Sequence, residues 1–209
     1  EGIVCRILDK EALIVGLDRL GMPAAMGDRF RRDITKPNGI ILVTGPTGSG
    51  KTTTLYSALT FLNKPDTKII TLEDPVEYLH KHKKSNINQR EIGRDTESFE
   101  KGMRAVFRQS PDVIVIGELR DKESFEIALR AARTGSLVIS TMNAANSTAV
   151  IRIIVNMFPE SQQNLITMLL ADSLLLSLAQ RLVPNKDKTG QVLALERFTN
   201  SNRISNLIR

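Results

Sequence analysis

The sequence predicts an α/β fold in which a mostly parallel central sheet is flanked by helices. Continuous apolar runs bounded by turn residues are typical of strands that are buried on both faces of a parallel sheet. Segments with helical spacing separate these runs, and the alternation indicates a layered fold. In such sheets, ligands bind at the carboxyl ends of the strands. The predicted strands are 37–44, 67–73, 112–118 and 136–142, and the predicted helices between them are 51–62, 96–109 and 121–134.

Further elements are predicted at both ends of the chain. Residues 2–8 alternate enough to form a strand, and residues 11–21 have helical spacing. Gly135 is expected to end one helix, and Asn146 is expected to cap the next. The C-terminal part is predicted to form a long helix at 161–181, a basic turn at 184–191, a strand at 191–198 and a short last helix.

The composition is that of a globular protein with a sizeable core, since 41% of the 209 residues are hydrophobic. The 29 Lys and Arg against 23 Asp and Glu leave a net charge of +6, which permits a nucleic-acid or anionic-membrane partner without requiring one. Aromatic residues make up only 4% and Trp is absent, so the stacking surfaces of single-strand binders are not expected. We therefore predict no nucleic-acid partner.

The single cysteine and the apolar segments bear on the compartment. Cys5 excludes an internal disulfide and a zinc site built from cysteines, and it favours a reducing compartment such as the cytoplasm. The most apolar long segment is interrupted by Asp172, Ser173 and Gln180, so it predicts a core helix and no transmembrane segment. Because the chain begins with Glu1 rather than Met, we expect a fragment.

Residues 45–52, GPTGSGKT, match the phosphate-binding pattern G-x-x-x-x-G-K-[ST] in full. The motif follows a predicted buried strand and precedes a predicted helix, which is the context that a P-loop requires. Its glycines let backbone N–H groups turn toward phosphate oxygens, the catalytic Lys51 reaches the β and γ phosphates, and the Thr52 hydroxyl is offered to Mg²⁺. The residues predicted to bind the nucleotide are Gly45, Pro46, Thr47, Gly48, Ser49, Gly50, Lys51, Thr52 and Thr53.

Carboxylates end two of the predicted strands, where phosphoryl transfer needs groups that complete the metal shell and orient water. Glu118 stands where a Walker B carboxylate is expected and is predicted to bind Mg²⁺ together with Thr52. Glu73, followed by Asp74 and Glu77, is predicted to polarise the attacking water. The alternatives are that these acids lie in solvated loops, or that Glu73 is the structural partner of a nearby arginine.

Longer motifs resemble the secretion ATPase superfamily of type II secretion and type IV pilus motors. The motifs are LEDPVEY (72–78), NQREIGRDT (88–96), RAVFRQSPDVIVIGELRD (104–121) and AARTG (131–135). The segments NQREIGRDT, FPE at 158–160, and ALE followed by RISNLIR are most similar to the pilus-retraction branch, which powers twitching motility. The four-cysteine motif common in assembly and secretion members is absent from the sequence.

The resemblance implies a RecA-like P-loop ATPase domain that binds ATP and Mg²⁺ and hydrolyses ATP as one subunit of a homo-hexameric motor. It divides the chain into the last strand of a truncated N-terminal domain (1–10), a linker with the first helices (11–36) and the ATPase domain (37–209), whose C-terminal end is expected to be truncated. The implied partners are further copies of the chain, an inner-membrane platform protein of a pilus or secretion machine, and a paralogous motor. The implied location is cytoplasmic, peripheral to the inner membrane.

The chain departs from this family at the His box, which usually reads TGH, then a strand, then TLH. Here residues 134–136 read TGS and residues 141–143 read TMN, so Ser136 and Asn143 replace both histidines. An asparagine amide can donate to a γ-phosphate but cannot take up a proton near neutral pH. We expect Asn143 to be an altered nucleotide sensor beside Glu118, and hydrolysis to be slow or partner-dependent.

Two arginines are candidates for roles at the site. Arg6 matches a family arginine position next to the linker, from which it would stabilise the transition state in a neighbouring subunit. The alternative is a strand-edge arginine in solvent. Arg120, beside Glu118, is the other candidate, and it would pair with Glu73 or Asp74 as internal scaffolding.

Other functions stay open at this point. An ATP-binding regulatory paralogue with weak hydrolysis, acting on a sister motor through mixed rings, is favoured by the replaced histidines. A RecA-like nucleic-acid translocase needs an aromatic and basic inner surface, of which the sequence offers little. A small-molecule kinase needs an Arg-rich lid, and we find no such segment. His80 and His82 lie in a basic run that is interpreted as a solvated loop rather than a metal site.

Overall fold

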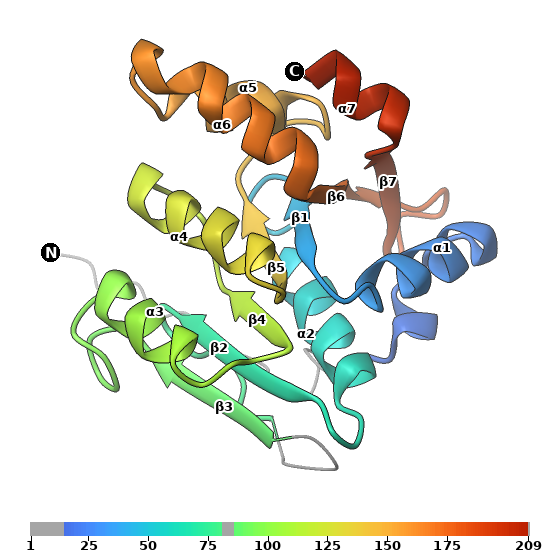
Figure 1. Cartoon of the computed structure of the whole chain (residues 1–209). Helices are drawn as coiled ribbons and strands as arrows, with labels where there is room; N and C mark the ends of the chain where they lie inside the picture. Colours follow the sequence, from blue (N-terminus) through green and yellow to red (C-terminus); the bar gives the residue numbers. More distant parts are fainter. Residues whose placement is uncertain (1–14, 81–85, 209) are drawn as a thin grey trace, which may run out of the picture.

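The computed structural model describes residues 15–80 and 86–208 (Figure 1). The predicted strand at 2–8 and the side chains of Arg6 and His82 lie outside these residues. The described elements, in chain order, are η1 (Leu17–Arg19), α1 (Ala24–Ile34), β1 (Gly39–Thr44), α2 (Lys51–Leu62), β2 (Lys68–Glu73), β3 (Asn86–Glu91), α3 (Phe99–Phe107), β4 (Val113–Ile116), α4 (Lys122–Arg133), β5 (Leu137–Met142), α5 (Ala149–Asn156), α6 (Glu160–Ser173), β6 (Leu174–Pro184), β7 (Gln191–Thr199) and α7 (Asn202–Ile208).

The strands form one seven-stranded sheet in the order β3-β2-β4-β5-β1-β6-β7. Neighbouring strands are parallel except β6 and β7, which pair antiparallel. This confirms the predicted α/β class with a mostly parallel sheet. Strand β5 lies between β1, which leads into the P-loop, and β4, which leads to Glu118. The carboxyl ends of all three strands therefore meet at one edge of the sheet.

Helices cover both faces of the sheet and enclose a separate core on each (Figure 1). Helices α3, α4, α5 and α6 contribute to one core, and η1, α1 and α2 contribute to the other. The strands supply alternate residues to the two cores, as in β5, where Val138 packs on one side and Leu137 and Ile139 pack on the other. Burial on both faces explains why these strands are apolar without alternation.

Local signals set the ends of the central helices close to the predicted positions. Asp121 caps α4 by accepting a hydrogen bond from the Ser124 N–H at 2.7 Å. Gly135, with φ of 110°, follows the C-terminus of α4 in the conformation that favours glycine. The Asn146 side chain accepts from the Ala149 N–H at 2.7 Å, where α5 begins. Both predicted helix-end residues therefore lie at helix ends.

The predicted helix at 161–181 is wrong in its second half. Helix α6 ends at Ser173, and the following residues form β6, which pairs with β1 through Ile41 and Leu176. The run LLLSLA is apolar except for Ser177, and periodicity alone does not separate a buried strand from a buried helix in such a run. In the structure, this segment lies in the sheet between β1 and β7 and is therefore a strand.

Two other elements differ from the sequence prediction. Strand β3 was not predicted, because NINQRE is polar and only Ile87 of its residues is buried at this edge of the sheet. Within the predicted helix at 11–21, the described residues form only the short 3₁₀ turn η1, and the long helix α1 follows it. Strand β3 is polar and lies at the edge of the sheet, so its sequence has no alternation of apolar and polar residues from which a strand could be predicted.

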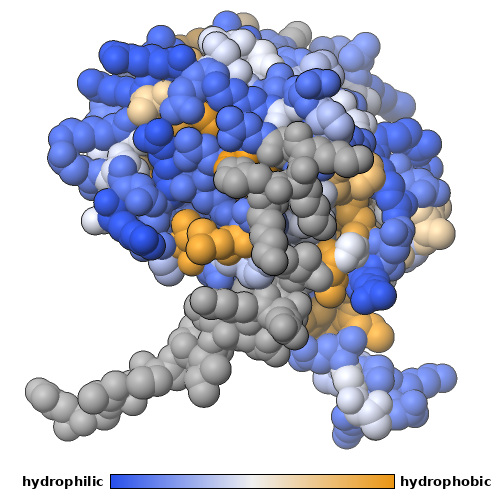
Figure 2. Space-filling model, turned by 90° about the horizontal axis from the view of Figure 1, so that it is seen from below, coloured by the Kyte–Doolittle hydropathy of each residue, from blue (hydrophilic) through white to orange (hydrophobic). Residues whose placement is uncertain are grey.

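The face seen in Figure 2 is largely hydrophilic, and hydrophobic side chains form separate patches on it. Leu165 and Met168 of α6 and Leu207 of α7 are among the exposed large hydrophobic residues. None of the described helices is both long enough and apolar enough to cross a membrane.

An ion pair joins α1 to the antiparallel edge of the sheet. The Arg197 guanidinium on β7 donates to the Asp33 carboxylate on α1 at 2.5 Å, and the two side chains are only 15% and 8% exposed. Lys36 lies 3.6 Å from the same carboxylate, but its side chain is 41% exposed. Arg197, the buried partner, therefore contributes more than Lys36 to the stabilisation by Asp33.

We expect Asp33→Ala to lower the free energy of unfolding by about 3 kcal/mol, because Arg197 keeps its buried charge without a counterion. Lys36→Ala, which removes the exposed partner, is the matched control and should cost less than about 1 kcal/mol. Chemical denaturation of both variants measures the difference. Equal losses would show that burial does not set the strength of this pair.

Candidate functional site

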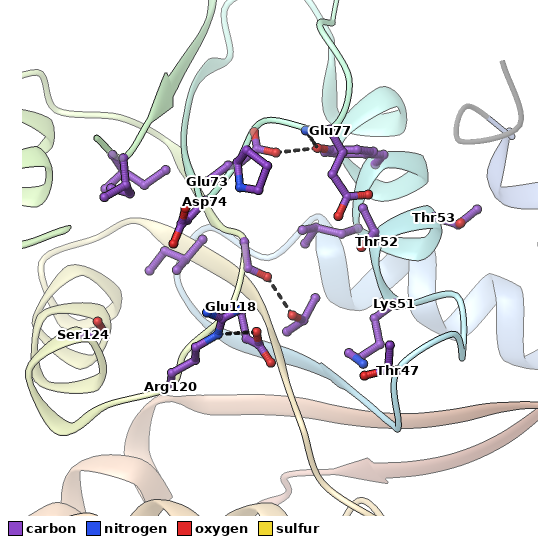
Figure 3. A pocket seen from close by; sticks show the side chains of 18 of the residues that line it. Thr47, Lys51, Thr52, Thr53, Glu73, Asp74, Glu77, Glu118, Arg120 and Ser124 are labelled. Carbon is purple, nitrogen blue, oxygen red and sulfur yellow. Dashed lines mark hydrogen bonds and ion pairs between the residues drawn. The ribbon is translucent and has the colours of Figure 1, made fainter. Parts of the chain in front are cut away.

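Most of the predicted site residues meet in a cleft of about 720 Å³ at the carboxyl edge of the sheet. Figure 3 shows the P-loop residues on one wall and two groups of carboxylates facing them. The lining includes Thr47, Gly48, Gly50, Lys51, Thr52 and Thr53 from the P-loop and α2, Glu73, Asp74 and Glu77 from β2 and the loop after it, Glu118 and Arg120 after β4, and Thr141 of β5.

The P-loop turns through backbone conformations that favour glycine. Gly45, Gly48 and Gly50 have φ values of 144°, 79° and 84°. A Cβ at Gly45 would lie 2.3 Å from the carbonyl oxygen of Gln180, whereas a Cβ at Gly48 would have no neighbour within 4 Å. Gly45, Pro46 and Ser49 belong to the motif but are not among the cleft-lining residues.

The Lys51 ammonium lies inside the curve of the loop. Its Nζ donates to the carbonyl oxygens of Gly45 at 2.8 Å and Pro46 at 2.9 Å. Burial lowers the pKa of Lys51, while the negative charge of Glu118 acts in the opposite direction. A cation held among backbone groups at a helix N-terminus is suited to binding an anionic phosphate chain.

Glu73 is 4% exposed and is held by three side-chain donors. The Tyr56 hydroxyl donates to Oε2 at 2.5 Å, and Oε1 accepts from the Thr71 hydroxyl at 2.6 Å and from Gln89 Nε2 at 3.2 Å. Glu73 makes no ion pair with an arginine among the described residues. A carboxylate has about four acceptor positions, so these donors leave about one, on Oε2, for a further ligand.

Tyr56 fixes both Glu73 and the loop after β2. Its oxygen also accepts from the Glu77 N–H at 3.2 Å. Burial raises the pKa of Tyr56, and the charge of Glu73 raises it further, so the hydroxyl stays protonated and able to donate. His80 packs edge-on against the rings of Tyr56 and Tyr78, with centroids 5.1 and 5.3 Å away. The interpretation of His80 as part of a solvated loop is therefore incomplete.

Glu118 is the more open of the two predicted catalytic carboxylates, with a side chain that is 28% exposed. Arg120 Nε donates to Glu118 Oε2 at 2.5 Å, which raises the pKa of Arg120. The expected pairing of Arg120 with Glu73 or Asp74 is therefore replaced by a pairing with Glu118. The Thr141 hydroxyl donates to the Gly117 carbonyl at 2.6 Å and holds the segment that carries Glu118.

The two residues that replace the family histidines lie at opposite ends of β5. Ser136 precedes the strand, away from the P-loop edge, and its hydroxyl donates to the Pro111 carbonyl at 2.8 Å. Asn143 follows the strand at the cleft edge, but its side chain is exposed and it is not among the cleft-lining residues. Thr141 is the β5 residue that lines the cleft. The sensor role of Asn143 stays a prediction.

Two strand residues that support the site were not predicted. Gln180 of β6 donates to the Ser49 carbonyl at 2.7 Å and accepts from the Thr54 hydroxyl at 3.0 Å. Gln89 of β3 holds Glu73 and also donates to the Tyr78 carbonyl at 2.9 Å. Both lie in segments whose strand character the sequence did not reveal. The sequence offered little signal for Gln180, which stands next to Arg181 at the end of the mostly apolar run 174–179.

We expect Gly45→Ala to lower the free energy of unfolding by about 3–5 kcal/mol, from steric overlap with the Gln180 carbonyl and the unfavourable φ. Gly48→Ala has the φ penalty without the overlap and should cost about 1–2 kcal/mol. Thermal or urea unfolding of the two variants compares them. A loss at Gly48 as large as at Gly45 would contradict the close packing of the loop against β6.

We expect Tyr56→Phe to lower the free energy of unfolding by about 2 kcal/mol, because a buried carboxylate loses a hydrogen bond to a neutral donor. Tyr78→Phe is the matched control, since its ring also packs on His80 but its hydroxyl does not bond to Glu73. Urea denaturation at neutral pH measures both variants. Equal effects would mean that the Tyr56 contact with Glu73 contributes nothing specific.

Comparison with known proteins places this site in a family. The family model described as type II/IV secretion system protein matches residues 1–206. The type IV pilus retraction ATPase PilT of Pseudomonas aeruginosa is 40% identical over 211 residues, covering 100% of this chain and 59% of that protein. A type II secretion system protein E from the same species is 44% identical over 184 residues, covering 88% of this chain and 35% of that protein.

A solved structure of the pilus retraction motor PilT with bound ADP has a TM-score of 0.89 and 44% identity to this chain. The match covers 98% of this chain and 58% of that one, so the chain spans about half the length of the pilus relatives that it matches. These similarities confirm the resemblance to pilus and secretion ATPases. The chain belongs to the type II/IV secretion system protein family.

Proposed function

We propose that the chain binds ATP with Mg²⁺ and hydrolyses it, as part of a motor subunit that powers type IV pilus retraction or a related secretion machine. One observation carries the proposal: Lys51, Glu73 and Glu118 line the same cleft beside an intact P-loop. The relatives named as a retraction ATPase and the ADP-bound motor structure support the choice of nucleotide. Membership of the type II/IV secretion system protein family supports the assignment to a pilus or secretion machine.

The P-loop and Lys51 hold the phosphate chain in this proposal. The N–H groups at the start of α2 point toward the phosphate oxygens, and the Lys51 ammonium leaves the Gly45 and Pro46 carbonyls to contact the β and γ phosphates. These contacts are electrostatic, and burial strengthens them because water screens them less. Thr53 extends the lining past the motif.

The oxygen donors Thr52 and Glu118 fit Mg²⁺, which prefers carboxylate, hydroxyl and phosphate oxygens. The described residues contain no cluster of three or more His, Cys, Asp or Glu suited to hold a metal alone. Thr52 and Glu118 would therefore hold the ion together with oxygens of the nucleotide. When bound, the ion neutralises charge that develops on the phosphate oxygens.

Glu73 is proposed to orient the attacking water. Its remaining acceptor position on Oε2 suits a single hydrogen bond from a water molecule, and three donors keep the carboxylate in one orientation. Because Glu73 is 4% exposed, few other waters compete for that position. The role requires orientation more than strong basicity, since phosphoryl transfer depends mainly on positioning and charge.

The assembly is proposed to be a homo-hexamer at the cytoplasmic face of the inner membrane, bound to a platform protein. Among the described residues that line the cleft, Arg120 is the one arginine, and it is bound to Glu118. Arg6 of a neighbouring subunit is the proposed source of a second cation for the transition state. An arginine supplied in this way fits a ring in which a neighbouring subunit contributes a side chain to each cleft.

The replaced histidines favour a second candidate, an ATP-binding regulator with weak hydrolysis. Asn143 is exposed, and Ser136 is far along β5 from the cleft edge, so neither supplies a titratable group to the cleft. Turnover decides between the two candidates, because both require ATP binding.

We expect Lys51→Ala to abolish ATP binding, whereas Glu73→Gln and Glu118→Gln should retain ATP affinity within a few fold and lose about 10² or more in kcat. Glu123→Gln, an exposed acid at the start of α4, is the matched control and should leave kcat unchanged. Calorimetric ATP binding and phosphate release, measured at increasing protein concentration, give both quantities. Tight ATP binding without turnover at any concentration would favour the regulator, and absence of ATP binding would refute the proposal.

A further inference from the structure

Gln180 lies beneath the P-loop, where β6 continues past the end of β1. Thr44, the last residue of β1, pairs with Ala179, so Gln180 is the next residue along and sits under the point where the loop begins. Its side chain is 3% exposed. It is therefore a buried polar residue between the buried Ala179 and the exposed Arg181.

Both ends of the Gln180 amide are satisfied by the phosphate-binding segment. Nε2 donates to the Ser49 carbonyl at 2.7 Å, and Oε1 accepts from the Thr54 hydroxyl at 3.0 Å. Thr54 lies in the first turns of α2 and is 1% exposed. The amide thus joins the last part of the loop to the helix that follows it.

The main chain of Gln180 also meets the loop. A Cβ at Gly45 would be 2.3 Å from the Gln180 carbonyl oxygen, and a Cβ at Gly50 would be 3.2 Å from Gln180 Nε2. The first and last glycines of this turn therefore both rest against one residue of β6. The loop cannot move toward the sheet, because Gln180 fills the space.

The hydrogen bond to Ser49 has a directional consequence. In a trans peptide the C=O of one residue and the N–H of the next point in opposite directions. Holding the Ser49 C=O against Gln180 therefore turns the Gly50 N–H the other way, toward the cleft that Gly50 lines. An N–H in that direction is a donor for a phosphate oxygen.

We propose that Gln180 is a positioning residue that orients the P-loop for phosphate binding. The inference rests on the proposed nucleotide-binding function and assigns it a residue outside the motif. A methionine of similar size would fill the same space but would release the Ser49 carbonyl and the Thr54 hydroxyl together. The space beneath the loop would then stay filled, but the hydrogen bonds that orient the loop would be lost.

The test is calorimetric titration of the chain with ADP and with ATP plus Mg²⁺, for wild type and Gln180→Met. We expect Gln180→Met to weaken both affinities about tenfold with unchanged stoichiometry, as expected for loss of the hydrogen bonds that orient the loop. Gln163→Met is the matched control, because the Gln163 side chain donates a hydrogen bond to the Phe158 carbonyl at the start of α6 and does not line the cleft. Its affinities should stay within twofold of wild type.

Hydrogen exchange separates positioning from a general structural role. We expect faster exchange in Gln180→Met to be confined to the amides of residues 45–54. Faster exchange throughout β1 and β6, or nucleotide affinities equal to those of wild type, would overturn the inference while leaving the proposed function intact. A wild-type chain that binds neither nucleotide would refute the proposed function and this inference with it.

A second variant keeps the test decisive if Gln180→Met does not fold. Thr54→Val removes one of the two amide contacts and should weaken ADP affinity about threefold, whereas Thr54→Ser keeps the hydroxyl and should restore it. Equal affinities for the valine and serine variants would also overturn the inference.

Discussion

The close approach of the P-loop to strand β6 is the constraint on which the site depends. Gly45 leaves β1 with a φ of 144° and passes so near the Gln180 carbonyl that no side chain fits between them. This contact fixes where the loop turns, and the turn fixes where α2 begins. Lys51 and Thr52 are the first residues of that helix, so their side chains reach the cleft only if the turn is made at this place.

The sheet also brings the carboxylates Glu73 and Glu118 to the edge where the P-loop lies. Parallel strands β2 and β4 end beside each other; Glu73 is the last residue of β2, and Glu118 follows β4 by two residues. Their surroundings differ: Glu73 is enclosed by Tyr56, Thr71 and Gln89, whereas Glu118 faces the cleft and contacts Arg120. Two carboxylates in different environments are suited to two different tasks. The enclosed one keeps a fixed orientation, and the open one has room for an ion.

The sequence revealed those parts of the fold and site that depend on local pattern. The motif at 45–52 and the apolar runs before it and before Glu118 predicted the P-loop, the strands and the meeting of the acids at one edge. Strand β6 and the role of Gln180 were missed because a mostly apolar run has no period that separates strand from helix. Gln89 was missed because its edge strand is polar, and Tyr56 because a tyrosine within a helix carries no sign of its distant partner.

The strand order has a consequence for the width of the site. Strand β5 separates β1 from β4, so the P-loop strand and the Glu118 strand lie two inter-strand spacings apart, which is about 9.5 Å. Thr141 of β5 forms the floor between them. The backbone hydrogen bonds of three paired strands therefore set the distance between the strand ends from which the P-loop and the Glu118 segment begin, and changes of side chains leave that distance unaltered.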